Sequence, residues 1–214
     1  MSPRIGLNRD AVVREAAALA DAEGIDALTL ARLAARLGVR PPSLYNHVAG
    51  IEALHRELAL LGLGELRDRL GRAAVGLAGE DAVVALADAY RAFGRERPGL
   101  YAATQWAPNP TDPLWLAMAR DAVDIVVAAL RAFDLDGDAA LHAVRGLRSL
   151  LHGFVALETT GGFGLPLDQD ESFRRLVRTY LAGLRTLAQR EHANTSVDTA
   201  HRGLGRQIAP HEDG

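Results

Sequence analysis

The chain has 214 residues, of which 49% are hydrophobic and 24% are charged. This balance is typical of a folded globular protein and excludes a disordered or fibrous chain. The absence of cysteine excludes disulfides, thiolate metal ligands and a cysteine nucleophile. No segment approaches the ~18 consecutive apolar residues of a membrane-spanning helix, and the first residues lack the pattern of a signal peptide. We therefore expect a cytoplasmic protein with no membrane-embedded part.

The formal net charge of −3 argues against a nucleic-acid partner, but the charges are unevenly distributed along the chain. Residues 27–51 contain no acidic side chain, whereas Arg32, Arg36, Arg40 and His47 all fall among them. Because DNA binding depends on neutralising phosphates, a local excess of cations matters more than the total charge. This segment is the first indication of a function.

Apolar residues recur at helical spacing almost throughout, and good helix formers dominate the composition, which together predict an all-α fold. A first helix is expected between Asn8, a good N-cap residue, and Gly24, which favours a helix end. A second helix begins after Thr29 and ends at Gly38. The third helix is short and covers residues 41–48, with proline in its first turn.

A long fourth helix from Ile51 is expected to link this first module to a larger second one. Further helices are predicted by the apolar periodicity at residues 80–97, 114–133, 139–160 and 168–190. Residues 191–214 are polar and lack this periodicity, so we expect a flexible tail. The predicted organisation is therefore a three-helix DNA-binding domain, a helical ligand-binding and dimerisation domain and a tail, at residues 1–50, 51–190 and 191–214.

The second and third helices have the outline of a helix-turn-helix, whose second helix enters the major groove of DNA. Arg32 and Arg36 lie four residues apart and project from the polar side of the second helix, where they can face phosphate. Leu44 and Val48 make the inward pair of the third helix. Because these two side chains point inward, Ser43, Asn46 and His47 remain free to contact base edges and phosphates. The alternative interpretation of the two arginines is a plain solvent-exposed helix face.

The segments Leu37-Gly38-Val39 and Pro42-Ser43-Leu44-Tyr45-Asn46-His47-Val48 resemble the helix-turn-helix of the TetR regulators. By this resemblance, the DNA-contacting positions of the recognition helix are Ser43, Tyr45, Asn46 and His47. The phosphate-facing positions implied for the preceding helix are Thr29 and Arg32. Two positions depart from the family pattern. Ile51 replaces a common lysine, and Arg40 replaces a common serine cap, from where it can reach the DNA backbone or a guanine.

The segment Leu151-His152-Gly153-Phe154, followed by Gly161-Gly162-Phe163, resembles the His-Gly type of TetR C-terminal domain, although the tryptophan that often precedes the His-Gly pair is absent. The resemblance covers roughly residues 8–190 and implies a homodimer in which the last two helices of each subunit form a four-helix interface. The residues expected in that interface are Phe154, Phe173, Val177, Tyr180, Leu181 and Leu184. The alternative is that this apolar stripe is buried within one subunit.

The resemblance also implies an effector, which differs from one TetR-type regulator to the next. Aromatic and apolar side chains around the proline-rich residues 107–113 are candidates for lining its pocket, with a histidine as polar anchor. These candidates are Tyr101, Trp106, Trp115, Met118 and His152. There are few charged residues among these candidates, which favours a small, largely hydrophobic effector. Ordinary core packing is the alternative for each of them.

An enzyme is the competing class of protein, but the sequence has no His-Glu-x-x-His motif, phosphate loop or Gly-x-Ser-x-Gly motif. A helical adaptor that binds a protein partner through the basic segment is a third alternative. We expect no catalysis, cofactor or metal. The favoured interpretation is a transcriptional repressor that a small molecule releases from its operator. That operator should be near-palindromic, because a two-fold dimer presents two equivalent recognition helices.

Overall fold

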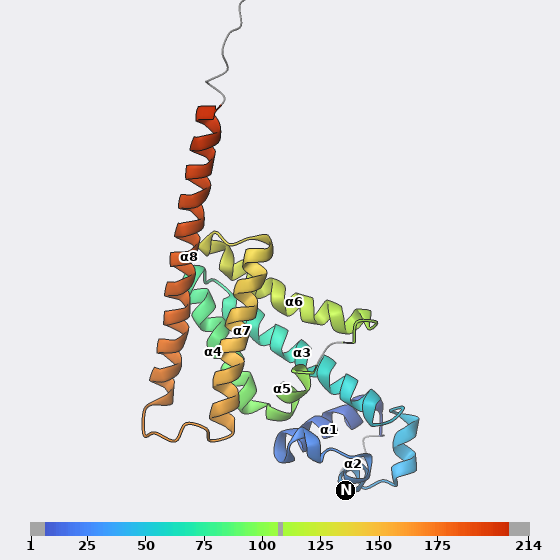
Figure 1. Cartoon of the computed structure of the whole chain (residues 1–214). Helices are drawn as coiled ribbons and strands as arrows, with labels where there is room; N and C mark the ends of the chain where they lie inside the picture. The colour runs from blue at the N-terminus through green and yellow to red at the C-terminus, as the bar shows by residue number, and fades with distance from the viewer. Residues whose placement is uncertain (1–6, 107–108, 206–214) are drawn as a thin grey trace, which may run out of the picture.

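The computed structural model describes the backbone of residues 7–106 and 109–205, and the side chains of these residues as far as Gln189. Every regular element in this part of the chain is a helix, so the all-α prediction is confirmed. Figure 1 shows a small group of helices at one end of the molecule and a larger bundle beside it.

The small group of helices is formed by α1 (Arg9–Glu23), η1 (Ile25–Ala27), α2 (Leu30–Leu37) and the 3₁₀ segment η2 (Pro41–Asn46). The side chain of Asn8 accepts a hydrogen bond from the backbone N–H of Ala11 at 2.8 Å. Thr29 accepts one from the backbone N–H of Arg32 at 3.2 Å. Gly38 ends α2 in the left-handed conformation with a φ of 67°. These caps confirm the predicted ends of the first two helices.

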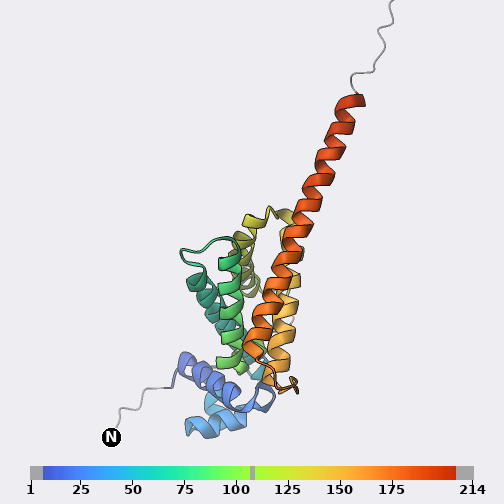
Figure 2. The same cartoon turned by 90° about the vertical axis from the view of Figure 1, so that its left-hand side faces the viewer.

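The bundle is formed by α3 (Ile51–Ala74), α4 (Gly79–Glu96), α5 (Pro98–Thr104), α6 (Pro113–Leu130), η3 (Arg131–Phe133), α7 (Gly137–Thr159) and α8 (Gln169–Gly205). Helix α3 begins at the small group of helices and runs through the bundle, whereas α7 and α8 form an antiparallel pair on the far side (Figures 1 and 2). One continuous apolar core extends from Val12 in α1 to Leu184 in α8.

Two predicted elements differ from the structure. Residues 41–48 were expected to form an α-helix, but η2 is a 3₁₀ helix that ends at Asn46. Two prolines remove its first backbone donors, and a segment this short supports few α-helical hydrogen bonds. Helix α8 continues to Gly205, so the predicted helix end at Arg190 is wrong. Apolar periodicity reports burial, whereas extending an existing helix adds one backbone hydrogen bond per residue and does not require a buried face. Residues 206–214 of the predicted tail lie outside the described residues.

The seven-residue helix α5 is packed closely between α1 and α3. A methyl group at Gly99 would overlap backbone atoms of Ala20 and Asp21, and one at Gly62 would lie 2.8 Å from the carbonyl oxygen of Leu100. The Asp21 carboxylate also accepts hydrogen bonds from the backbone N–H groups of Gly99 at 2.9 Å and Leu100 at 3.2 Å. These groups lie in the first turn of α5 and have no partner within the helix. Helix α5 therefore joins the small group of helices to the bundle.

We predict that Gly99→Ala lowers the free energy of unfolding by about 1–3 kcal/mol, because the added methyl group forces α5 away from the α1 backbone. The matched control is Gly71→Ala in α3, where a methyl group would meet only the side chain of Ile125 at an ordinary 3.9 Å. That control should gain roughly 0.5–1 kcal/mol from the better helix propensity of alanine. Urea denaturation followed by circular dichroism measures both. A Gly99→Ala variant as stable as the wild type would contradict the close packing.

Candidate DNA-binding surface and ligand cavity

The recognition segment η2 is anchored by apolar side chains and presents polar ones to solvent. Leu44 is completely buried and Val48 is 5% exposed, which confirms the predicted inward pair. Tyr45 is 61% exposed. The other predicted base-reading side chains are exposed or half-buried, namely Ser43, Asn46 and His47. The structure thus brings all four predicted recognition residues to one surface segment that a DNA groove can approach.

The arginines of α2 do not form the isolated basic surface that the sequence suggested. Arg32 pairs with Glu23, and Arg36 pairs with Glu15, both of which lie on α1. The acid-free segment of the sequence therefore acquires acidic neighbours from an earlier helix. Arg40, at the start of η2, is exposed and forms no ion pair with the side chains described here. Thr29, expected at phosphate, uses its side chain to cap α2.

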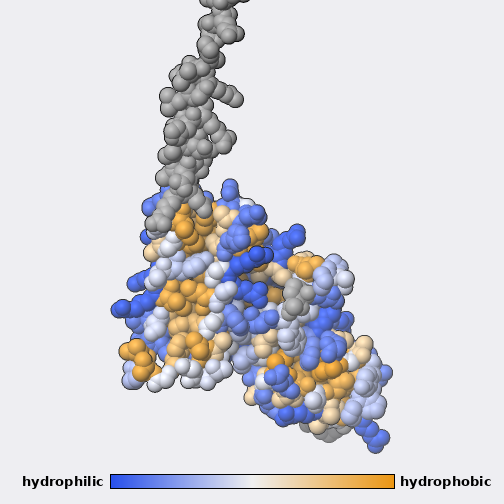
Figure 3. Space-filling view, viewed as in Figure 1, coloured by the Kyte–Doolittle hydropathy of each residue, from blue (hydrophilic) through white to orange (hydrophobic). Residues whose placement is uncertain are grey.

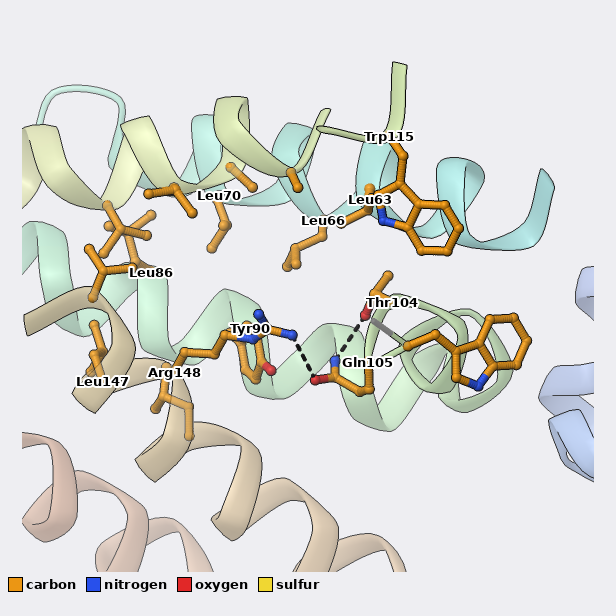
Figure 4. Close-up of a pocket in the computed structure, with 17 residues that line it drawn as sticks. Leu63, Leu66, Leu70, Leu86, Tyr90, Thr104, Gln105, Trp115, Leu147 and Arg148 are labelled. Atoms are coloured by element: carbon orange, nitrogen blue, oxygen red, sulfur yellow. Dashed lines mark hydrogen bonds between the residues drawn. The ribbon is translucent and has the colours of Figure 1, made fainter. Parts of the chain in front are cut away.

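A cavity of about 150 Å³ lies inside the bundle, between α3, α4, α5, α6 and α7. Its walls are mostly leucine, valine, alanine and aromatic side chains (Figure 4). The lining residues are Leu63, Leu66, Leu70, Leu86, Tyr90, Thr104, Gln105, Trp106, Trp115, Ala119, Ala122, Val123, Val126, Val144, Leu147, Arg148 and Leu151. A concave, mainly apolar site with a few polar groups is the usual form of a small-molecule pocket.

Three polar residues of the cavity wall, Arg148, Gln105 and Thr104, are linked by hydrogen bonds. The Arg148 guanidinium donates a hydrogen bond to Gln105 Oε1 at 3.2 Å. Gln105 Nε2 in turn donates to Thr104 Oγ1 at 2.9 Å and to the Tyr101 carbonyl oxygen at 3.3 Å. Figure 4 shows Arg148 extending along one side of the cavity toward Gln105, across from the α3 leucines. The C-terminal end of α5 therefore contributes both polar and aromatic surface to the cavity.

Two of the five predicted effector residues, Trp106 and Trp115, line this cavity. The other three do not. The Tyr101 hydroxyl lies 2.6 Å from His152 Nδ1, forming a pair behind the lining residue Tyr90. Burial raises the pKa of Tyr101. Met118 packs at Gly64 outside the lining set.

The lining residues Thr104, Gln105 and Arg148 were not predicted from the sequence, because neutral or solvent-facing polar residues carry no pattern of their own. Their proximity to predicted candidates was the available signal. Gln105 precedes Trp106, and Arg148 lies one helical turn before His152.

Two family profiles match this chain, one over the helix-turn-helix and one over much of the bundle. The profile of the family described as "Bacterial regulatory proteins, tetR family" matches residues 12–58, and that of the "Tetracyclin repressor-like, C-terminal domain" matches residues 83–180. The HTH-type transcriptional regulator YobS of Bacillus subtilis (strain 168) is 40% identical over 86% of this chain and 96% of its own length. This chain belongs to the TetR family of transcriptional regulators. The predicted family is confirmed.

Further relatives agree with a TetR-family regulator. An HTH-type transcriptional regulator of Mycobacterium tuberculosis is 38% identical over 83% of this chain and 82% of its own length. The HTH-type transcriptional repressor DrrR1 of Streptomyces coeruleorubidus is 30% identical over 81% of this chain and 58% of its own length. All three relatives are named as transcription regulators, and none is named as an enzyme.

Solved structures share the fold of this TetR-family chain. A protein of unknown function from Rhodococcus sp. RHA1 matches with a TM-score of 0.69 and 26% identity, covering 86% of this chain and all of that one. The TetR-family protein ActR of Streptomyces coelicolor, in complex with (S)-DNPA, matches with a TM-score of 0.60 and 22% identity, covering 85% and 98%. Within the described ranges, no helix is long and apolar enough to cross a membrane.

Most of the residues predicted for the TetR-type dimer interface are buried within the chain, which favours the alternative of burial within one subunit. The side chains of Phe173, Val177 and Leu181 are at most 2% exposed. Phe154 and Phe173 pack around the guanidinium of Arg91 from α4, which lies 5.2 Å and 4.7 Å from their ring centroids.

The remaining predicted interface residues also pack within the chain. Leu184 is buried, and Tyr180 donates a hydrogen bond to the Ala143 carbonyl oxygen at 2.6 Å. The apolar stripe of α8 thus faces α4 and α7 of the same chain.

A row of ion pairs connects the cavity wall with the small group of helices. Asp112 caps α6 by accepting hydrogen bonds from the backbone N–H groups of Leu114 and Trp115, each at 3.2 Å. It also accepts from Arg56 of α3 at 2.5 and 3.1 Å, and this hydrogen-bonded pair, with help from the backbone donors, holds the pKa of Asp112 below its usual value. Arg56 and Arg9 both pair with Glu57, at 3.1 and 2.5 Å. The row therefore runs from α6 through α3 to α1.

We predict that Asp112→Asn lowers stability at neutral pH and that this difference disappears in strong acid. Asparagine keeps an oxygen for the cap but loses the charge that pairs with Arg56. Because the folded protein holds the pKa of Asp112 below its unfolded value, about 3.9, the ion pair stabilises the fold above that value and is lost as pH falls through the lower, folded pKa. Denaturant unfolding across this pH range tests the prediction. Asp124→Asn, at an exposed position of α6, is the control, and an equal pH-dependent difference in both variants would contradict the assignment.

Proposed function

We propose that this TetR-family protein is a homodimeric repressor that a small molecule in the bundle cavity releases from a near-palindromic operator. The observation that carries the proposal is that α5 contacts both functional parts. Its first turn is held by Asp21 of α1, and its last turn and following residues, Thr104 to Trp106, line the cavity. The repressor name of DrrR1 and the ligand bound to ActR support the same kind of function here.

The DNA contacts follow from the exposed surface of η2 and α2. Ser43, Tyr45, Asn46 and His47 are the side chains that read base edges, because they project from the segment that Leu44 anchors. Arg40 forms no ion pair with the described side chains and is free to bind phosphate. Arg32, Arg36 and Thr29 are further phosphate contacts. The two arginines must exchange partly exposed carboxylate partners for phosphates, and exposed ion pairs are weak enough to allow this exchange.

The dimer surface that we propose lies beside the buried stripe rather than on it. Apolar side chains gather over α7 and α8 in Figure 3. Leu157 of α7 is 49% exposed and Leu187 of α8 is 53% exposed. The two helix flanks adjoin, because the Tyr180 ring lies against Gly146. The apolar or small residues at helical spacing along these flanks are Gly146, Leu150, Gly153 and Leu157 on α7, and Leu176, Gly183 and Leu187 on α8.

Two routes can transmit ligand binding to the DNA-binding surface. Helix α5 passes a displacement of the cavity wall directly to α1 through its close contact at Gly99. The ion pairs of Asp112 and Arg56 connect the N-terminus of α6, which carries the lining residue Trp115, to α3. Moving a population from 99:1 to 1:99 requires about 10⁴-fold preference for one form, or roughly 5.5 kcal/mol. The ligand must therefore bind the released form much more tightly than the operator-bound form.

We predict that selection of genomic fragments with the purified protein recovers a near-palindromic operator. Three arginines in each of two protomers make about six phosphate contacts, which gives a slope of log K against log salt near −5. Arg40→Ala should reduce the magnitude of this slope by about 2 on every sequence, whereas Asn46→Ala should relax the preference at one base position by about 1–3 kcal/mol. Arg131→Ala, in the distant η3, is the control. Salt-independent retention, or an unchanged selected motif for Asn46→Ala, would contradict these assignments.

We also predict that Leu157→Glu gives folded monomers that have lost high-affinity operator binding, because the charge would be desolvated in the proposed interface. Leu141→Glu is the matched control, since Leu141 is 45% exposed on the opposite flank of the same helix. Light scattering measures the oligomeric state and circular dichroism measures the helix content. A Leu157→Glu variant that remains dimeric, or a Leu141→Glu variant that alone becomes monomeric, would overturn the proposed surface.

A further inference from the structure

Arg148 is the only charged residue among the seventeen that line the cavity. Its guanidinium contacts a neutral amide, that of Gln105, and forms no ion pair with any carboxylate in the part of the chain whose side chains are described. Other arginines that reach into the bundle are matched by acids. Arg91 pairs with Glu158 and Asp170, and Arg97 pairs with Asp21 and Glu65. The cavity therefore presents a positive charge that the protein itself does not neutralise.

Arg148 is an exposed residue, and one hydrogen bond directs its guanidinium toward the polar end of the cavity. Gln105 Oε1 accepts from Arg148, and Gln105 Nε2 is fixed by its bonds to Thr104 and to the Tyr101 carbonyl oxygen. A guanidinium carries five N–H donors, so this single contact leaves most of them for a ligand. Its planar donors match the two oxygens of a carboxylate, and a charge-assisted pair is strengthened where water is partly excluded.

The rest of the cavity sets the size and polarity of the remainder of the ligand. Leucines of α3 form the wall across from Arg148, and Trp115 lies at one end (Figure 4). Trp106 also lines the cavity. The volume of about 150 Å³ is comparable to that of an apolar protein cavity that admits a benzene-sized molecule. One aromatic ring or a short alkyl chain therefore fits between these side chains, with an acidic group at the Arg148 end.

We propose that the ligand of this cavity is a small amphipathic carboxylate, whose acid group pairs with Arg148 and whose single ring or short chain packs against the α3 leucines and the two tryptophans. This assignment rests on the proposed function, in which the cavity is the effector site. A cationic ligand is repelled by Arg148. A neutral apolar ligand would remove water from the guanidinium without replacing its hydrogen bonds, which costs binding free energy.

The test compares three probes of nearly equal shape, namely 3-phenylpropionate, its primary amide and 3-phenylpropylamine. Binding to the full-length dimer is followed by the fluorescence of Trp106 and Trp115, the only tryptophans of the chain, and by calorimetry. We expect the acid to bind at least about tenfold more tightly than the amide, and the amine to bind most weakly. Arg148→Gln should remove the preference for the acid and keep the weaker binding of the amide. Arg145→Gln, at an exposed position of α7 outside the lining set, is the matched control and should keep the preference.

Three results overturn the proposal. These are equal or tighter binding of the amide or amine, no saturable binding of the acid at millimolar concentration, and an unchanged preference for the acid in Arg148→Gln. Operator binding measured in parallel separates this inference from the proposed function. An acid that binds through Arg148 without releasing the operator contradicts the proposed function and leaves the ligand class intact. Release of the operator by an amide or amine alone leaves the function intact and contradicts the ligand class.

Discussion

The close contact between α1 and α5 is the constraint on which the arrangement of the two parts depends. Gly99 brings two backbones together at a distance that no side chain permits, and Asp21 occupies the first-turn donors of α5. A contact made by backbone atoms is stiff, because neither partner has rotamers through which it can yield. The position of the DNA-binding helices is therefore coupled to α5, and any change in the cavity wall that moves α5 must also move α1.

Much of the fold could be predicted because its signals are local. Asn8, Thr29 and Gly38 set helix ends through contacts with residues only a few positions away, and the structure has these ends where the sequence predicts them. The recognition segment was predictable for a similar reason, since the inward pair Leu44 and Val48 fixes which side chains remain outside. The end of α8 could not be predicted, because loss of apolar periodicity marks the end of burial and not the end of the helix.

The parts that could not be predicted depend on residues distant in the sequence. The basic segment has no acidic residue in its own stretch of sequence, but in the folded protein Glu15 and Glu23 of α1 pair with its arginines. An apolar stripe shows that one face of α8 is buried, but it does not show which residues cover that face. In the structure Arg91 of α4 packs against this face, over the rings of Phe154 and Phe173. Likewise, the cavity is lined by five helices, and of the five candidates that the sequence suggested only the two tryptophans line it.

The residues that line the cavity are mostly different from the residues that join the bundle to the DNA-binding helices. This separation affects how such regulators can change the ligands that they bind. Most lining residues, such as Leu86 and Val123, contact the cavity and are not part of the α1–α5 contact or the Asp112 ion pairs. Their size and shape can change while the mechanical connection to the DNA-binding helices stays the same. Gly99 and Asp21 cannot be substituted in the same way, because they form the α1–α5 contact. One scaffold can thus come to bind different ligands through substitutions at the cavity wall, while the contact that we propose to couple the cavity to DNA binding stays unchanged.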